Sequence, residues 1–525
     1  MPIPMLPRPV RNLLFALCLC GTAAMAAAQP QWFEGGRPTT DAMHAAQVLA
    51  AAGDHGLDPA DYEAASLLTR LAAAAQGPAT GDAEQRAVGL ALTAGLQRYL
   101  THLQRGRVDP QQLHADLNLP HRPALDSAGL VGSALAAHRL PQALRDAEPH
   151  VPMYGGLRRA LARYRDLAGH PAWATRLPPL PARKLLPGQA YAGVAALAQR
   201  LEALGDLAPG QSVPERFDGA LVTALQAFQE RHGLAPDGVL GAATLRELDI
   251  TPAARMRQIE LAMERLRWTP LLQGPRMIVV NIPEFVLRAY EASGQRIDVR
   301  LTMKVIVGKA LRNRTPLLAE SMRFIEFSPY WNVPPSIARG ETMPRLRRDP
   351  GYLEREGLEF VTADGQVVTT LAPSHLDAVL RGGWRIRQRP GPQNALGGIK
   401  FVFPNNANIY LHDTPARRLF ERERRDFSHG CIRLQAPAAL ARFVLRDEPA
   451  WTEERIRQAM TAGLSTTLRL EQPVPVLIAY STVVARAGAV YFYRDLYGHD
   501  AVLDRALRER AAGLPPLFGR TGPGP

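Results

Sequence analysis

The nonapeptide "DFSHGCIRL" (residues 426–434) contains the only cysteine of the chain that lies after position 28. In an extended segment His429 and Cys431 point to the same face, because side chains alternate along a strand. Gly430 between them allows a backbone or a ligand to come close, and the Cys431 N–H is placed to help hold an oxyanion. A cysteine attacks a carbonyl only as the thiolate, so it needs a partner that takes its proton.

A second histidine ends the predicted strand "NIYLHD" (408–413), and a short connection, positions 414–427, separates this strand from Ser428. If the two strands are neighbours in one sheet, the connection between them brings His412 beside Cys431. Taken singly, each residue also has a structural interpretation, since a lone cysteine is often a small buried side chain and a lone histidine part of a core. Two histidines around one cysteine favour a nucleophile and its base.

The N-terminal segment, positions 1–28, has the pattern of a secretory signal peptide. Arg8 and Arg11 precede the apolar stretch "LLFALCLCG" (13–21), and "AMAAA" (24–28) offers small residues for cleavage. A retained membrane anchor is the alternative, although the stretch is short for a span of about 20 residues. We expect a periplasmic protein whose mature chain forms no internal disulfide, so that its thiol is either inert and buried or reactive.

The chain has 525 residues, too many for one hydrophobic core, so several domains are expected. Its formal net charge of +13 comes from arginine, since only four lysines occur, at positions 184, 304, 309 and 400. The balance favours anionic ligands. The arginines are scattered along the chain, which indicates solvated surface charge and not a nucleic-acid interface.

The N-terminal half predicts helices. Residues 31–180 are expected to form a helical domain, with a cap at Thr39 or Thr40 and with Leu157, Ala160, Leu161 and Tyr164 on one helix face. A Pro-rich joint (176–188) leads into a small three-helix module, residues 181–251, whose turn is at Asp237-Gly238. A linking helix is expected within residues 252–275.

From residue 276 to residue 500 the pattern predicts a mainly β domain, as in the alternation from Ile297 to Met303. Residues 330–396 interrupt the strands with prolines and short helical pieces, too irregular for a sheet, and predict an insertion. Strands within 466–485 and 489–498 are expected to close the domain. Residues 501–525 are expected to hold a C-terminal helix and a disordered tail, "GLPPLFGRTGPGP". The fold class is therefore multidomain α+β.

The motif that joins "HD" (412–413) through the connection 414–427 to "SHGCIRL" (428–434) resembles the signature of the L,D-transpeptidase catalytic domain, the YkuD-type fold. The segments "YWNVPPSIARGETMPRLRRDPGYLE" and "RQRPGPQNALGGIKFVFPN" resemble the large periplasmic YcbB-like branch, in which a helical scaffold, a peptidoglycan-binding module and a capped catalytic domain follow one another. The stretch "VTALQAFQERHGLAPDGVLGAATLREL" resembles the peptidoglycan-binding domain. A plain packing module is the alternative for this stretch.

The resemblance implies that Cys431 is the nucleophile and His412 the general base. The other site residues that it implies are the supporting His429 and Ser428, Gly430 at the oxyanion site, Arg433 as a grip for a substrate carboxylate, and Tyr410, Trp331 and Asn332 at the substrate cleft. The family often has glycine after the upstream histidine, where this chain has Asp413. Whether the Asp413 carboxylate or a backbone carbonyl orients His412 stays open.

The implied reaction is a 3→3 cross-link between peptidoglycan stem peptides, formed through a cysteine thioester on a tetrapeptide stem. Residues 330–396 would cap the cleft and exclude water. The alternatives are an L,D-carboxypeptidase, an enzyme that attaches or releases a lipoprotein, and a wall-binding scaffold with a dead site. No HExxH or CxxC motif is present, so we expect neither a metal nor a cofactor. Expected partners are stem peptides and glycan, penicillin-binding proteins or other wall enzymes, and carbapenems as covalent inhibitors.

Overall fold

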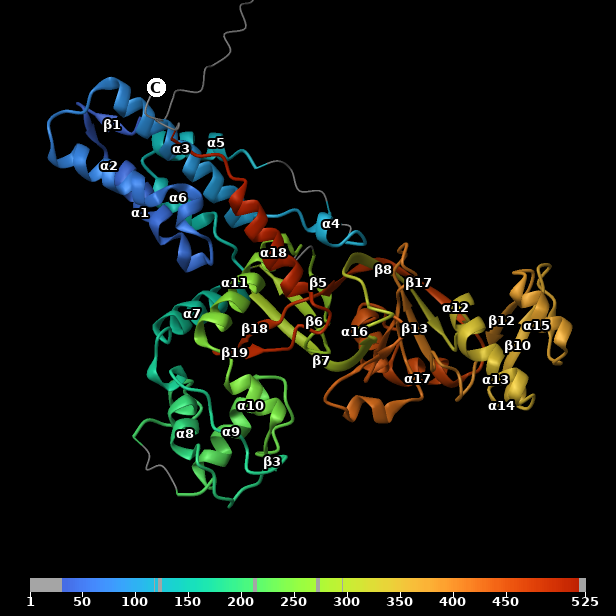
Figure 1. The fold of residues 1–525 in the computed structure, drawn as a ribbon. Helices are drawn as coiled ribbons and strands as arrows, with labels where there is room; N and C mark the ends of the chain where they lie inside the picture. The colour runs from blue at the N-terminus through green and yellow to red at the C-terminus, as the bar shows by residue number, and fades with distance from the viewer. Residues whose placement is uncertain are drawn as a thin grey trace, which may run out of the picture.

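The computed structural model describes residues 31–117, 119–120, 125–210, 215–270, 274–294 and 296–518. The expected signal peptide, residues 1–28, lies outside these ranges. Figure 1 shows an N-terminal group of helices, a small helical module, a central sheet and an insertion that projects from the far side of the sheet. The predicted multidomain α+β architecture is confirmed. None of the described helices has the length and apolar character needed to cross a membrane.

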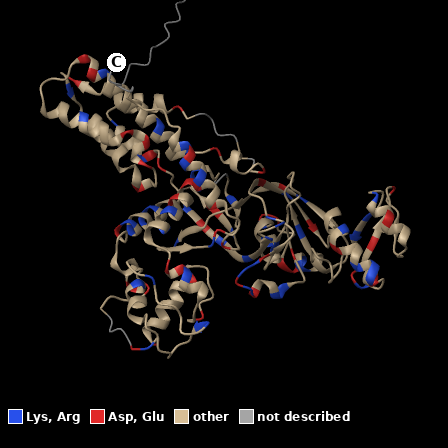
Figure 2. Cartoon of the chain, viewed as in Figure 1, with Lys and Arg blue, Asp and Glu red and all other residues tan. Residues whose placement is uncertain are grey.

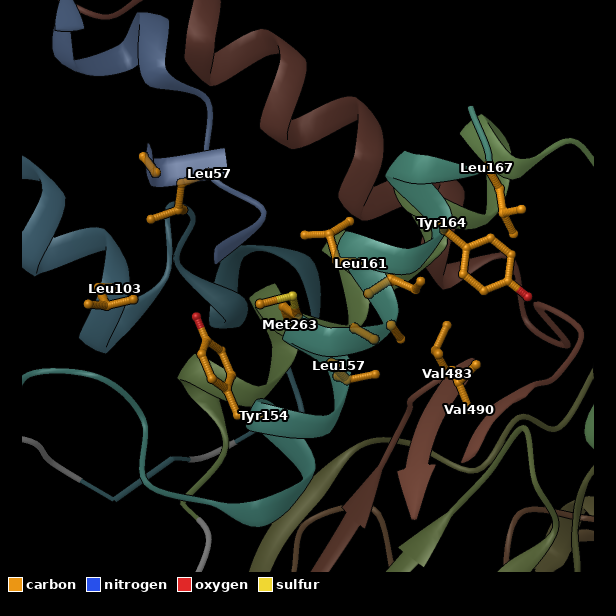
Figure 3. Close-up of a cluster of buried hydrophobic side chains, with 14 of the residues drawn as sticks. Leu57, Leu103, Tyr154, Leu157, Leu161, Tyr164, Leu167, Met263, Val483 and Val490 are labelled. Atoms are coloured by element: carbon orange, nitrogen blue, oxygen red, sulfur yellow. The ribbon is translucent and has the colours of Figure 1, made fainter. Parts of the chain in front are cut away.

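The N-terminal helices bury alanine and leucine along one face each. The predicted cap is Thr39, whose hydroxyl accepts a hydrogen bond from the Ala42 N–H at 3.2 Å. The expected apolar face of α7 is buried from Leu157 to Tyr164 and packs against α11 (Figure 3). The helices are α1 (Thr40–Ala50), α2 (Ala64–Gln76), α3 (Asp82–Arg105), α4 (Pro110–Leu113), α5 (Ser127–Ala136), α6 (Leu140–Asp146) and α7 (Pro152–Asp166).

The small module contains α8 (Val194–Ala203), α9 (Ala220–Arg231) and α10 (Ala242–Leu248). The stripe formed by Leu221, Leu225 and Phe228 of α9 is buried, as its helical spacing predicts. Gly238 has a φ of +69°, and the Asp237 carboxylate accepts the Val239 N–H at 2.9 Å, so this dipeptide forms the expected turn. A short strand pair, β3 (Lys184–Leu185) with β4 (Leu240–Gly241), closes the module.

The long helix α11 (Pro252–Trp268) connects this module to a nine-stranded sheet. The strand order is β15-β7-β16-β14-β13-β8-β17-β5-β6, and a further pairing of β6 with β7 closes the sheet on itself. The bounds are β5 (Arg276–Asn281), β6 (Val286–Ser293), β7 (Arg296–Gly308), β8 (Leu318–Phe327), β13 (Ile399–Val402), β14 (Leu411–His412), β15 (Asp426–Ser428), β16 (Ile432–Leu434) and β17 (Thr466–Ala479). Helices α16 (Pro437–Val444) and α17 (Glu453–Thr461) lie between β16 and β17 in the chain.

The insertion corrects one expectation, because it contains a four-stranded antiparallel sheet of order β11-β10-β12-β9. The strands are two to four residues long, too short to produce an alternating pattern among the prolines and helical turns. Phe360 and Leu346 are fully buried in a core of the insertion's own. The elements are β9 (Trp331–Asn332), α12 (Pro335–Ile337), the π-helical turn η4 (Ala338–Thr342), α13 (Met343–Arg348), α14 (Tyr352–Arg355), β10 (Leu358–Val361), β11 (Val367–Val368), α15 (Pro373–Leu380) and β12 (Arg385–Gln388).

The C-terminal segment corrects two more expectations from the sequence. The hairpin of β18 (Val483–Arg486) and β19 (Ala489–Phe492) is separate from the nine-stranded sheet, and its Val483 and Val490 pack beside α7 and α11 in the helical core (Figure 3). Helix α18 (His499–Ala512) then runs back to the N-terminal helices (Figure 1). The expected disordered tail is wrong for residues 517 and 518, whose amides donate to the Glu63 carboxylate at 2.6 and 3.3 Å.

Charge is distributed over the whole molecule. Figure 2 shows basic and acidic residues interleaved on every part of the chain. Several arginines pair inside the protein, as Arg267 does with Glu264 at 2.9 Å, both with fully buried side chains. The scattered arginines thus include structural ion pairs as well as the solvated charges expected from the sequence.

Candidate active site

The two segments singled out in the sequence are neighbouring strands. β14 and β16 pair in parallel, with Leu411 opposite Ile432 and His412 opposite Arg433. The Ile432 N–H donates to the Tyr410 carbonyl at 3.1 Å, which continues the ladder toward the cysteine. Because side chains alternate along a strand, residues 410, 412, 431 and 433 share one face of the sheet. The register places His412 beside Arg433, two residues past Cys431.

Cys431 is a free, partly exposed thiol. Its Sγ lies 3.6 Å from the Asn408 carbonyl, and its side chain is hydrogen-bonded to that of Tyr410. Burial raises the pKa of the thiol, while the hydrogen bonds from Tyr410 and the charges of Lys400 and Arg433 oppose this shift. The resting group is therefore a neutral thiol, and Tyr410, Lys400 and Arg433 offset part of the cost of forming its anion.

His412 lies on the buried floor of the site. Its Nδ1 lies 2.5 Å from the Asp413 carbonyl oxygen, and because a carbonyl can only accept, Nδ1 carries the proton and Nε2 can accept one. Burial, followed by the charge of Arg433, lowers the pKa of His412 to about 3. An imidazole with its pKa lowered this far is neutral at rest.

The sequence left open which group orients His412, and in the structure it is the backbone carbonyl of Asp413. The Asp413 carboxylate turns away from His412 and accepts the N–H groups of Gly398 at 2.9 Å and Thr414 at 2.7 Å. It also pairs with Arg417 at 2.5 Å. Asp413 thus fixes the strand end, and its own C=O selects the tautomer of His412.

Tyr410 joins the nucleophile to groups that the sequence did not single out for the site. Its ring packs edge-on against His412, with centroids 5.6 Å apart, and Lys400 Nζ lies 4.7 Å from the ring centroid. Lys400 also bonds Glu326 at 3.1 Å. Burial raises the pKa of Tyr410, and so does the proximity of Cys431. A phenol that stays protonated serves as a hydrogen-bond donor.

The residues before the cysteine are held tightly. Ser428 Oγ donates to the Cys431 carbonyl at 2.6 Å and accepts the Gly430 N–H at 3.2 Å. Gly430 has a φ of +117°, a region that favours glycine, and a Cβ there would lie 3.3 Å from Ile409 Cδ1. Since the Gly430 N–H is already engaged, the Cys431 N–H is the remaining candidate at the oxyanion site.

The insertion reaches the site at two points. His429 Nε2 lies 2.7 Å from the Glu341 carboxylate of η4, and Trp331 of β9 is hydrogen-bonded to the Tyr410 side chain. π-Helical turns such as η4 are often found at functional sites. Asn332 is exposed beside Trp331 and pairs with Arg387 of β12. His429 therefore faces the insertion, whereas His412 shares the sheet face of Cys431.

Arg433 is a cation in the floor of the site. Burial lowers the pKa of Arg433, and the proximity of Cys431 raises it. Among the described residues its Nε is buried without a hydrogen-bond partner. Sequence reasoning found this residue but not the contacts of Lys400, Glu326 and Glu341, although Lys400 was conspicuous as one of four lysines in an arginine-rich chain.

A cavity of about 340 Å³ lies elsewhere, between the outer face of β5 and β6 and the start of α7. Its walls include Met153, Met277, Tyr290 and Leu477, and no residue of the "SHGC" segment lines it. The residues of the motif lie instead on and around β14 and β16, within the sheet.

Family comparisons agree with this geometry. The L,D-transpeptidase catalytic domain, YkuD, matches residues 275–466, and a scaffold domain matches residues 24–161. A "Putative peptidoglycan binding domain" matches residues 191–248. The sheet that carries Cys431 is thus an L,D-transpeptidase catalytic domain. The chain thus combines a YkuD-type L,D-transpeptidase catalytic domain with a peptidoglycan-binding domain.

A relative in Haemophilus influenzae, described as "Putative L,D-transpeptidase", is 31% identical over 263 residues, which are 50% of this chain and 51% of the relative. The chain thus matches about half the length of this curated relative. Among solved structures, an L,D-transpeptidase from Xylanimonas cellulosilytica is 14% identical, with a TM-score of 0.17 over 57% of this chain and 100% of that chain. The structure of Bdellovibrio bacteriovorus Bd1075 is also 14% identical, with a TM-score of 0.17 over 45% of this chain and 56% of that chain.

Proposed function

We propose that the protein is a cysteine-dependent L,D-transpeptidase that forms 3→3 cross-links between peptidoglycan stem peptides. The observation that carries the proposal is the parallel pairing of β14 with β16, which sets Tyr410, His412, Cys431 and Arg433 on one face of a YkuD-type sheet. The membership in the YcbB-like branch is part of the same proposal.

In the first half-reaction, the Cys431 sulfur attacks the carbonyl of the diaminopimelate residue in a tetrapeptide stem. The thiol proton passes to His412 and then to the nitrogen of the leaving D-alanine, so a C–S bond replaces the C–N bond. Because the resting thiol and imidazole are both neutral, the proton leaves sulfur as the new bond forms. Tyr410 and the Cys431 N–H stabilise the negative charge that develops.

In the second half-reaction, the side-chain amine of diaminopimelate on a neighbouring stem attacks the thioester. The amine loses a proton to His412, the amide forms, and the sulfur leaves and is reprotonated. Trp331 and Glu341 hold the insertion over the nucleophile, which would exclude water and favour the amine over hydrolysis. Arg433 is proposed to hold a stem carboxylate.

The setting proposed for this activity is the periplasm, reached through the signal peptide in residues 1–28. The peptidoglycan-binding domain at residues 191–248 supports the polymer as the substrate. Penicillin-binding proteins or other wall enzymes are proposed partners, and carbapenems are proposed to acylate Cys431.

Mass spectrometry of muropeptides after incubation with purified protein tests the reaction. Tripeptide–tetrapeptide or tripeptide–tripeptide dimers with a 3→3 bond are expected, because the donor stem loses its D-alanine, and they should be absent with Cys431→Ala. Tripeptide monomers alone would identify an L,D-carboxypeptidase. Transfer to a lipoprotein lysine, or release of that lysine, would identify an attachment or release enzyme.

Intact-mass analysis with a carbapenem separates an enzyme from a dead scaffold. The wild-type protein is expected to gain the mass of one drug molecule, and Cys431→Ala none. An unmodified wild-type protein, or an adduct that persists in Cys431→Ala, would contradict a nucleophilic role for this cysteine.

A further inference from the structure

The connection between β7 and β8 forms a basic loop, residues 309–317, with the sequence "KALRNRTPL". Lys309, Leu311, Arg312 and Arg314 are exposed, and Leu311 is 94% exposed. Within the described part of the chain, Lys309 and Arg312 form no ion pair. The loop contains no acidic residue. Among the described residues Arg314 forms no ion pair either, but its Nε donates to the Ala310 carbonyl at 2.7 Å. Lys309 and Arg312 are therefore the two cations that the loop presents around an apolar tip.

The base of the basic loop is rigid. The Gly308 N–H donates to Thr315 Oγ1 at 2.9 Å, and Tyr497 Oη both donates to the Gly308 carbonyl at 2.7 Å and accepts the Thr315 N–H at 3.2 Å. The Ala310 N–H donates to the Asp426 carboxylate at 3.2 Å. A single exposed leucine is ordinary on a protein surface. Here buried hydrogen bonds fix the backbone at both ends of the loop, so part of the cost of ordering a binding surface is already met by the fold.

The basic loop adjoins the nucleophile. The Lys309 N–H donates to the Ser428 carbonyl at 3.1 Å, and Thr315 Oγ1 donates to the Gly430 carbonyl at 2.7 Å. The Arg314 carbonyl oxygen lies 3.8 Å from where a Cβ on Gly430 would be. The loop thus holds the chain on both sides of His429, and His429 itself points to Glu341 of the insertion. The motif is bordered by the insertion on one side and by the basic loop on another.

We propose that the basic loop is a binding surface for an acidic stem peptide, with Lys309 and Arg312 meeting its carboxylates and Leu311 its alanine methyl groups. This inference rests on the proposed function and names how that site holds its substrate. A stem peptide carries the free carboxylates of its glutamate and diaminopimelate residues, separated by a few atoms, beside alanine side chains. Two exposed cations that flank a leucine match this chemistry in sign, with an apolar group between the charges.

The donor stem and the acceptor stem have the same chemistry, so the test has two arms. Release of D-alanine in the presence of a small amine reports the donor stem alone, and formation of dimers reports both stems. The double variant Lys309→Ala/Arg312→Ala is expected to raise KM about tenfold, with kcat nearly unchanged, in whichever arm uses the loop. Lys309→Arg/Arg312→Lys, which keeps both charges, is expected to have the wild-type KM. Added salt is expected to raise the KM of the wild-type protein more than that of the double alanine variant.

The matched control is Arg86→Ala/Arg139→Ala, which removes two exposed arginines, one on α3 and one immediately before α6, and changes the net charge equally. It is expected to leave KM unchanged. Since all four side chains are exposed, both double variants are expected to unfold at the wild-type temperature, which calorimetry verifies.

Direct binding separates this inference from the proposed function. A labelled tetrapeptide stem is titrated onto Cys431→Ala, with and without Lys309→Ala/Arg312→Ala. Weaker binding in the triple variant supports the loop even if no turnover is detected. An active wild-type protein whose KM and stem affinity are both unaffected by the loop substitutions would overturn the inference and leave the proposed function intact. Inactivity of the wild-type protein in both arms would contradict the proposed function alone.

Discussion

The contact between Tyr410 and Cys431 can be tested by removing one oxygen atom. In Tyr410→Phe the ring remains against His412, but the hydroxyl that is hydrogen-bonded to the sulfur is lost. A hydrogen bond to a charged group contributes about 1.5–3 kcal/mol, which corresponds to roughly ten- to hundredfold less thiolate at a pH below the pKa of the thiol. The remaining thiolate is more basic and more nucleophilic, which returns nearly half of this loss on a logarithmic scale. The alkylation rate should therefore fall by about three- to tenfold.

The assay is the rate of iodoacetamide labelling of protein produced without residues 1–28, in which Cys431 is the only cysteine, followed by intact mass between pH 6 and pH 10. We expect the Tyr410→Phe profile to be displaced to higher pH, with the difference in rate narrowing as the wild-type thiol ionises and reversing once both thiols are ionised. Tyr330→Phe is the control, since Tyr330 is partly exposed and its described ring contact is with Arg387 at 4.1 Å. Superimposable profiles for Tyr410→Phe and the wild-type protein would refute the reasoning that this hydroxyl stabilises the thiolate.

Two further outcomes follow from named contacts. Glu341→Ala removes the partner of His429. Because the pair is partly exposed, the free energy of unfolding in urea should change by less than about 1 kcal/mol. The ratio of hydrolysed stem to dimer should nevertheless rise, because water can enter the site. An unchanged ratio would show that this pair does not hold the insertion closed. Burial, followed by the charge of Arg510, lowers the pKa of His102 to about 3. Below pH 6.5 the unfolded chain therefore binds a proton at this histidine that the folded chain excludes. The free energy of unfolding should fall as the pH falls from 6.5 toward 3. The loss between pH 7 and pH 5 should be about 2 kcal/mol smaller in His102→Asn than in the wild-type protein, measured by urea unfolding at both values, and equal losses would contradict this role of His102.

Local patterns identified most of the elements around the site. The sequence predicted a strand at "NIYLHD", and its pairing with "GCIRL" was the condition under which the chain between them would bring His412 beside Cys431. The structure confirms the adjacency. The chain between His412 and Cys431 is short, so few topologies can accommodate it, and this limitation made the inference sound.

The local sequence pattern could not predict the register between β14 and β16. A shift of one residue between strands exchanges the face on which every side chain lies, and the register depends on the core packing of the whole sheet. It is the tertiary pairing that places Tyr410 against the sulfur and sets His412 opposite Arg433. Tyr410 was expected only as a residue of the substrate cleft.

The insertion and the hairpin of residues 483–492 show a second limit. Strands of two to four residues in the insertion have no period to detect, and long-range pairing alone stabilises them. The sequence pattern predicts strands in this hairpin. Helices that lie far earlier in the chain nevertheless bury its Val483 and Val490. Which surface covers an apolar face depends on the whole chain.

By itself the sequence determined the nucleophile candidate, the order of the helical and β regions and the turn of the small module, because these depend on residue chemistry and on short-range periodicity. Only the tertiary structure decided the hydrogen-bond partner of the thiol, the tautomer of His412 and the position of the basic loop beside the motif. These features depend on distances between segments far apart in the chain, and such distances are set by the packing of the complete core.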